Sequence, residues 1–155
     1  MELSDCIAAQ FEGVEEWSAE SIGERLSGIP ELEALVRPHV TEPDGHAYGR
    51  NVVYADERME AIVIHLPAGA ATAVHDHGAS IGCAVVAEGC MTNEIYRLGA
   101  DGKVVLDEAH AVRGGERMPS PAGVIHRMRN DGASRLVSLH VYAPPLGGMT
   151  RYSLE

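Results

Sequence analysis

The apolar positions of this chain follow two different spacings. Near the start they recur every fourth residue, as at Leu3 and Ile7, and this period is typical of a helix with one apolar face. Ser18 or Ser21 can cap a second helix, and Ser21 with Glu24 matches a capping box. The pattern therefore predicts a helical N-terminal segment.

From about residue 47 the pattern changes to short runs rich in Val and Ile, separated by Gly, Pro and Asp. Such runs are typical of strands joined by tight turns. The predicted strands are 50–55, 59–66, 71–77, 81–88, 91–98, 103–109, 124–129 and 135–143. With no helical pattern between them, they favour a mainly β fold, an antiparallel barrel or jelly roll. We expect one domain over 1–155, with the helical segment at about 1–40 and the barrel at about 46–155.

Charge narrows the possible partners. The chain has 23 acidic and 12 basic residues and a formal net charge of -11, which disfavours nucleic acid and anionic membranes. The three cysteines do not suggest a disulfide framework. No secretory signal is visible and no apolar run is long enough to span a membrane. We therefore expect a cytoplasmic protein. We also expect a monomer.

Three histidines are candidates for a metal site. His75 and His77 form a His-x-His pair in a predicted strand, where alternation would point both rings to one face. His126 lies in a later strand that can come close to the first. Neutral imidazoles of this kind bind first-row transition metals. Taken alone, however, the pair fits a surface or structural role equally well.

A row of polar side chains lies in the last long predicted strand. Alternation places Ser138, His140 and Tyr142 on one face. The other face is apolar: Val137, Leu139 and Val141. If the polar face is buried, its three side chains must find hydrogen-bond partners and would bond in series. The alternative is a polar face exposed to solvent.

Two glycine-spaced motifs connect the histidines to a known architecture. They consist of Gly69, His75, His77 and Gly89, followed by Gly115, Pro121, Gly123, His126 and Asn130. In this order and spacing the chain resembles the cupin superfamily, which implies a small antiparallel β-barrel with a metal inside.

The first motif departs from the usual cupin pattern in one respect. Cupins commonly have a glutamate ligand four or five residues after the His-x-His pair, where this chain has Ile81 or Gly82. No carboxylate lies between His77 and Glu88. The predicted site is therefore three neutral histidines with open positions, which favours an anionic ligand. A zinc site with three histidines and water is the alternative.

A longer set of residues resembles the cysteine dioxygenase family, over roughly residues 46 to 152. The matching segments are Tyr48-Gly49-Arg50-Asn51, His75-Asp76-His77, His126-Arg127 and Ser138-Leu139-His140-Val141-Tyr142 with Pro144-Pro145. Members of this family oxidise a thiol to a sulfinate with O₂.

The resemblance implies a role for each matching residue. His75, His77 and His126 would ligate iron(II), and Arg50 would pair with the substrate carboxylate with help from Tyr48. A fixed guanidinium suits a bidentate carboxylate.

The resemblance also implies a row that faces the open side of the metal. Tyr142 would place its hydroxyl over that side, His140 would hydrogen-bond Tyr142, and Ser138 would brace His140.

Two further departures refine this resemblance. Mammalian members have a cysteine at the position of Gly82 that crosslinks to the tyrosine matching Tyr142; we expect Tyr142 unmodified here and Cys83 buried on the opposite face. The second departure is Met149, which lies near the position where mammalian members have another cysteine. In this respect the chain resembles bacterial members that have arginine at the position of Arg50. Relatives that act on 3-mercaptopropionate tend to have glutamine at the position of Arg50, so Arg50 favours L-cysteine as the substrate.

The hypothesis from sequence is an iron(II)-dependent thiol dioxygenase that converts L-cysteine and O₂ to cysteine sulfinic acid. Its partners would be a small thiol and O₂, with no nucleic acid and no membrane. The alternatives are a dioxygenase of another small thiol such as 3-mercaptopropionate, a non-catalytic metal-binding cupin, and a metal-dependent cupin isomerase or hydrolase.

Overall fold

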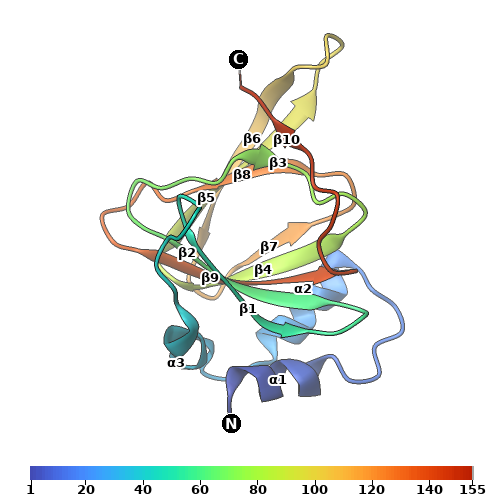
Figure 1. Ribbon diagram of the computed structural model, residues 1–155, viewed down its shortest axis with the longest axis vertical. Helices are drawn as coiled ribbons and strands as arrows, with labels where there is room; N and C mark the ends of the chain where they lie inside the picture. Colours follow the sequence, from blue (N-terminus) through green and yellow to red (C-terminus); the bar gives the residue numbers. More distant parts are fainter. Residues whose placement is uncertain (155) are drawn as a thin grey trace.

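Two five-stranded antiparallel sheets face each other and form the walls of a barrel (Figure 1). The computed structural model describes residues 1–154. The first sheet has the order β1 (Gly49–Ala55), β2 (Glu60–Leu66), β9 (Leu136–Ala143), β4 (Ile81–Glu88) and β7 (Arg117–Ser120). The second sheet has the order β10 (Arg151–Tyr152), β3 (Val74–His75), β8 (Ile125–Arg129), β5 (Cys90–Leu98) and β6 (Val104–Arg113). The predicted mainly β barrel is confirmed.

Each predicted strand has a counterpart, but two predicted ranges differ clearly from the structure. The strand predicted over 103–109 continues to Arg113 in β6. The strand predicted over 71–77 is reduced to the two residues of β3, so His77 lies beyond its end. Two strands were not predicted. The first is β7, an edge strand that contains Pro119, and proline is tolerated at a sheet edge. The other, β10, has only two residues and forms by pairing with β3, a partner distant in sequence.

The N-terminal segment is helical as predicted, with α1 (Leu3–Gln10), α2 (Ala19–Ser27), α3 (Leu32–Val36) and the 3₁₀ helix η1 (Arg37–His39). Ser18 caps α2: its hydroxyl accepts from the Ser21 backbone N–H, and the Ser21 hydroxyl accepts from the Ser18 N–H, both at 3.0 Å. The capping box predicted for Ser21 with Glu24 is therefore wrong, because Ser21 occupies the third helical position.

The helices lie against the outer face of the first sheet (Figure 1). Leu3, Ile7 and Phe11 pack in one cluster with the apolar side of β9, represented by Leu139 and Val141, and all five are fully buried. This packing removes one face of the sheet from water. The opposite face of β9, with its polar row, therefore points into the barrel.

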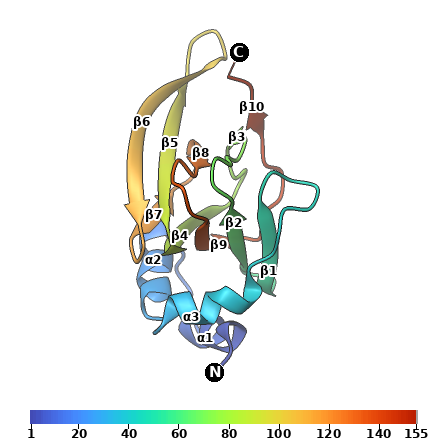
Figure 2. The same cartoon turned by 90° about the vertical axis from the view of Figure 1, so that its left-hand side faces the viewer.

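Within residues 1–154, no helix covers the outer face of the second sheet. Its β5–β6 hairpin extends beyond the rest of the barrel (Figure 2), and Leu98, Val105 and Leu106 on it are exposed. None of the helices within residues 1–154 has the length and apolar character of a membrane-spanning segment.

Candidate metal centre

His75, His77 and His126 come together inside the barrel. His75 on β3 stands directly opposite His126 on β8 in the antiparallel register. The three side chains are buried and each offers a ring nitrogen, all within 4.8 Å of one another. The predicted histidine cluster is therefore present.

His77 is held by the chain after β3 and not by strand alternation. The Asp76 carboxylate accepts hydrogen bonds from the backbone N–H groups of Gly78 and Thr150 at 3.0 and 2.9 Å, and from the Tyr152 hydroxyl at 2.8 Å. Asp76 therefore ties this segment to the C-terminal residues. It points away from the metal site, as expected, and its anchoring turns His77 inward.

Two of the three rings are fixed in the tautomer that a metal needs. The Nδ1 of His75 donates to the Ala73 carbonyl at 2.7 Å, and the Nδ1 of His126 donates to the Asn93 side-chain oxygen at 2.8 Å. Both Nε2 atoms then carry lone pairs directed at the cluster. Partners of this kind orient metal-ligating histidines in proteins.

Asn93 was missed by the sequence analysis, although a signal for it exists. It lies on β5 and is only 5% exposed. On that strand it shares the inward face with Met91 and Ile95 by alternation. A polar residue on an otherwise apolar inward face must be hydrogen-bonded, and here its partner is a candidate ligand.

The cluster fits a divalent transition metal. The Nε2 atoms of His77 and His126 are 3.2 Å apart, and the Nδ1 of His77 is buried without a hydrogen-bond partner. If His77 carries its proton on Nδ1, the lone pairs of the two Nε2 atoms face each other. If His77 carries its proton on Nε2, its Nδ1 is a buried acceptor without a donor. A cation between the Nε2 atoms would relieve the first arrangement.

The charge states of the cluster agree with this. Burial lowers the pKa of His75 and takes that of His77 to about 4, with His75 as the next cause for His77. Burial, then His75 and His77, also lowers the pKa of His126 well below its usual value. All three rings are therefore neutral at pH 7, the state in which imidazole binds metals.

The polar row of β9 is buried and bonded in series, so the alternative of an exposed polar face is wrong. The Ser138 hydroxyl is 2.7 Å from His140 Nε2, and His140 Nδ1 is 3.1 Å from the Tyr142 hydroxyl. Burial, followed by His77 and His75, lowers the pKa of His140 to about 3. Burial also raises the pKa of Tyr142. Both groups are therefore neutral at pH 7.

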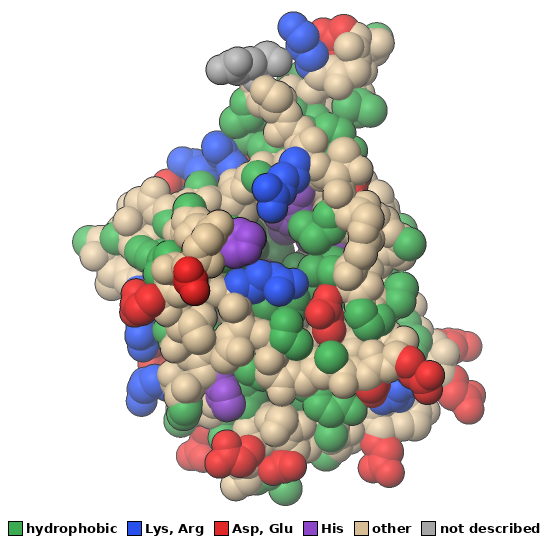
Figure 3. Space-filling view, in the orientation of Figure 1, with side chains coloured by type: hydrophobic (Ala, Val, Ile, Leu, Met, Phe, Trp, Pro, Cys, Tyr) green, Lys and Arg blue, Asp and Glu red, His purple; other side chains and the backbone are tan. Residues whose placement is uncertain are grey.

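One cavity brings the row and the cluster together. Tyr142 lies against His77, with ring centroids 4.9 Å apart. The cavity between the two sheets is lined by Tyr48, Arg50, His75, His77 and Tyr142, among others. The space-filling view shows a hollow on this side of the molecule, with histidine at its rim and Lys or Arg side chains on both sides of it (Figure 3).

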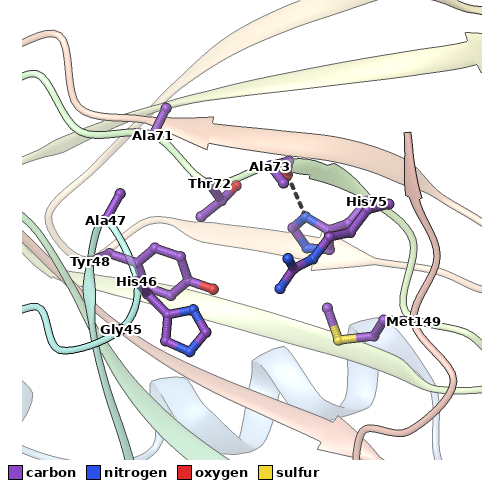
Figure 4. Close-up of a pocket in the computed structure, with 10 residues that line it drawn as sticks. Gly45, His46, Ala47, Tyr48, Ala71, Thr72, Ala73, His75 and Met149 are labelled. Carbon is purple, nitrogen blue, oxygen red and sulfur yellow. Dashed lines mark hydrogen bonds between the residues drawn. The ribbon is translucent and has the colours of Figure 1, made fainter. Parts of the chain in front are cut away.

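The outer part of this hollow is drawn in Figure 4, where Tyr48, Thr72, His75 and Met149 surround one space. These four residues line both the inner cavity and its outer part, so the two are continuous. His46 was expected at the surface; it is exposed, and it stacks on Tyr48 with ring centroids 5.4 Å apart.

Gly82 faces Tyr142, whereas Cys83 faces away from it. A Cβ added at Gly82 would stand 2.5 Å from Tyr142 Cδ1. Cys83 is buried in the cluster beneath the helices, and burial raises the pKa of its thiol to about 11. The predicted placement of Cys83 on the opposite face is confirmed, and no sulfur lies at position 82 to react with the tyrosine.

Comparison with known proteins agrees with this geometry. Residues 38–155 match the family described as cysteine dioxygenase type I.

Solved structures show the same fold at low identity. A Klebsiella pneumoniae protein with a double-stranded β-helix domain is 21% identical and has a TM-score of 0.60 over 76% of this chain and 94% of its own. A protein from Thermus thermophilus is 26% identical, with a TM-score of 0.56 over 71% and 94%. An oxalate decarboxylase from Lactobacillus farciminis, solved with formate, is 13% identical, with a TM-score of 0.60 over 74% and 34%. The fold is therefore the double-stranded β-helix of cupins.

Proposed function

The chain belongs to the cysteine dioxygenase type I family, and on this premise we propose that it is an iron(II)-dependent dioxygenase that converts L-cysteine to cysteine sulfinic acid. In this reaction both atoms of O₂ are added to the thiol sulfur; sulfur loses four electrons, O₂ gains them, and the thiol proton remains with the product. The observation that carries the proposal is a three-histidine cluster without a carboxylate, facing Arg50 and Tyr142 across one cavity.

His75, His77 and His126 would hold the metal. The three imidazoles carry no charge, which would favour an anionic thiolate beside the metal. When bound, iron(II) supplies the centre at which thiolate and O₂ meet and through which electrons pass from one to the other. Zinc would fit three histidines but does not undergo this redox chemistry.

Arg50 would orient the substrate by its carboxylate. It lines the cavity, and among residues 1–154 it makes no ion pair that would occupy its guanidinium. Tyr48 lines the same cavity and would add a hydroxyl donor. A carboxylate held there fixes which end of the substrate faces the histidines.

Tyr142 would present its hydroxyl proton to the reacting atoms. If Ser138 donates to His140 Nε2, then His140 Nδ1–H donates to the Tyr142 oxygen, and the phenol O–H is free to point into the cavity. The raised pKa of Tyr142 keeps that proton on the oxygen. In this arrangement Ser138 and His140 act as positioning residues for Tyr142.

The direct experiment is to load the protein with iron(II) and measure O₂ uptake and sulfinate with L-cysteine, cysteamine and 3-mercaptopropionate. We expect oxidation of L-cysteine with the highest kcat/KM of the three. If kcat/KM is highest with 3-mercaptopropionate, the protein is a dioxygenase of that thiol and not of L-cysteine. No O₂ uptake with any thiol would overturn the proposal and leave a metal-binding cupin.

Arg50→Gln tests the carboxylate contact. Loss of a charge-assisted hydrogen bond costs about 1.5–3 kcal/mol, so KM for L-cysteine should rise by roughly tenfold or more. Cysteamine has no carboxylate and should show no such rise. Arg97→Gln, on the exposed hairpin, removes the same charge outside the cavity and is the matched control. Equal KM for L-cysteine in parent and Arg50→Gln would remove Arg50 from its role.

Tyr142→Phe tests the proton donor. Without the hydroxyl, we expect more O₂ consumed per sulfinate formed, measured by parallel oxygen electrode and product assays. Tyr54→Phe is the matched control, because the Tyr54 hydroxyl bonds Asp56 outside the cavity. An O₂-to-sulfinate ratio that is the same in Tyr142→Phe and in the parent would contradict the role.

A further inference from the structure

A second arginine faces the outer part of the cavity. Arg151 lies on β10, directly opposite His75 of β3. Residues opposite each other in an antiparallel pair share a face, so Arg151 points to the side on which His75 meets the cluster. It lines the outer cavity together with Tyr48, His75 and Met149. The next residue, Tyr152, points the other way, to Asp76.

This arginine has no carboxylate partner. Most arginines of the chain are paired or hydrogen-bonded; Arg127 and Arg129, for example, share Glu94 at 2.7 and 3.3 Å. In the described part of the chain four arginines have side chains without an ion pair or a hydrogen bond, and two of them, Arg50 and Arg151, line the cavity. Two unpartnered arginines at one cavity are notable in a chain with a formal net charge of -11.

The cavity also lacks acidic groups. Neither its inner nor its outer part is lined by Asp or Glu among residues 1–154. Two carboxylates on segments that border the cavity are engaged elsewhere. Asp76 accepts from Thr150 and Tyr152, and Glu60 accepts from the Leu146 backbone N–H at 2.6 Å. Among residues 1–154, Arg151 therefore has no ion pair, and no carboxylate lies in the lining of the cavity beside it.

We propose that Arg151 forms a second anion-binding subsite at the cavity mouth, which extends the substrate range to small thiols that carry a second carboxylate. The inference rests on the proposed dioxygenase function. One carboxylate would bind Arg50 and the thiolate would face the histidines, while the second carboxylate would bind Arg151.

The charges support this assignment. The site would carry four positive charges: two from a divalent metal held by the neutral histidines, and one each from Arg50 and Arg151. A thiolate with one carboxylate offsets two of them, and a second carboxylate offsets a third. Bidentate pairing of a guanidinium with a carboxylate is also directional, so the second contact would select the orientation of the substrate as well as its charge. The oxidation itself is unchanged, with both atoms of O₂ added to sulfur.

The test uses two probes that differ by one carboxylate, mercaptosuccinate and 3-mercaptopropionate. Their dissociation constants are measured by anaerobic calorimetry on the iron-loaded protein, and their KM values by sulfinate formation. The parent should bind mercaptosuccinate about tenfold more tightly, as one charge-assisted contact implies. In Arg151→Gln the ratio of the two dissociation constants should fall about tenfold, to a value near one. Arg151→Lys should retain part of the preference.

Arg97→Gln is the matched control, since it removes one positive charge from the exposed hairpin and should keep the parent's preference. Thermal unfolding of each variant verifies that it is folded. If the parent shows no preference, or if Arg151→Gln and Arg97→Gln change it equally, the second subsite is refuted. Failure of the dioxygenase function would instead appear as no sulfinate from any thiol, while the anaerobic binding preference would still decide the role of Arg151.

Discussion

The two sheets of the barrel contribute different chemistry to the same cavity. The second sheet contributes His75 and His126, with Asn93 behind His126. The first sheet contributes Arg50 on β1 and the polar row that ends at Tyr142 on β9. The second sheet therefore holds candidate ligands, and the first sheet holds Arg50 and Tyr142, which are proposed to act on what the metal binds. Arg151, on β10 of the second sheet, adds the proposed outer contact.

The two walls are also stabilised differently. The first sheet is covered by the helices on its outer face, where Leu139 is fully buried. The outer face of the second sheet is open and is held by exposed and half-buried ion pairs such as Arg129 with Asp131. The polar row Ser138–His140–Tyr142 is shielded from water and held rigidly because the helices and the apolar side chains beneath them pack against the other face of β9. The uncovered sheet instead orients its ligands by local hydrogen bonds.

The largest effect should come from removing a candidate ligand. His126→Ala should lower iron affinity by more than the roughly 10–100-fold that loss of a supporting hydrogen bond costs, measured as bound iron after dialysis against a chelator. His110→Ala on the exposed β6 is the matched control and should retain iron. Full iron binding by His126→Ala would break the assignment of the second sheet as the metal wall.

The next effect concerns the layer behind the first sheet. Leu139→Ala should lower the free energy of unfolding by about 2–5 kcal/mol, the usual cost for a buried leucine. Leu106→Ala, 50% exposed on the second sheet, should change it by no more than about 0.5 kcal/mol. Urea denaturation measures both. Similar losses in the two variants would show that the two sheets do not differ in their outer support.

A smaller effect is expected at Asn93. Asn93→Ala removes the acceptor for His126 Nδ1 and should lower iron affinity by roughly 10–100-fold, read by chelator competition. Thr92→Ala is the control on the neighbouring residue, whose hydroxyl bonds Asp131 on the outer face. An iron affinity equal to the parent's would mean that the second sheet orients His126 without this hydrogen bond.

The smallest effect is a pH dependence of the metal-free protein. Burial holds the pKa of His140 at about 3 in the folded state, against about 6.5 in an unfolded chain. Below pH 6.5 the unfolded chain therefore binds a proton that the folded protein does not, and stability falls as the pH drops from 6.5 towards 3. At pH 5.5 this histidine alone costs about 1 kcal/mol relative to pH 7.5.

Urea denaturation at these two pH values, in parent and His140→Gln, measures that cost. The variant should lose about 1 kcal/mol less than the parent between pH 7.5 and pH 5.5. The same loss in both proteins would show that His140 does not contribute to the pH dependence and that the polar row is not kept in a dry environment.

Much of this architecture was predictable from local pattern. The change from a helical period to short Val- and Ile-rich runs near residue 47 predicted the helical segment and the barrel. Alternation in 135–143 predicted which face of β9 would be apolar. The motifs around His75, His77 and His126 predicted the histidine cluster through their resemblance to cupins. The helical and strand patterns depend on near neighbours in the sequence, and local stereochemistry determines them.

Other features depend on contacts between distant segments, and only the tertiary structure decided them. Asn93 supports His126 because β5 lies beside β8, and Arg151 faces the cavity because two C-terminal residues pair with β3. His77 turns inward because Asp76 binds Thr150 and Tyr152, although the strand predicted there ends at His75. Residue types and their spacing thus determined the helical segment and the strands, and the resemblance to cupins pointed to the three histidines. Long-range pairing, which no local pattern records, determined the partners of those histidines and the second arginine at the mouth of the cavity.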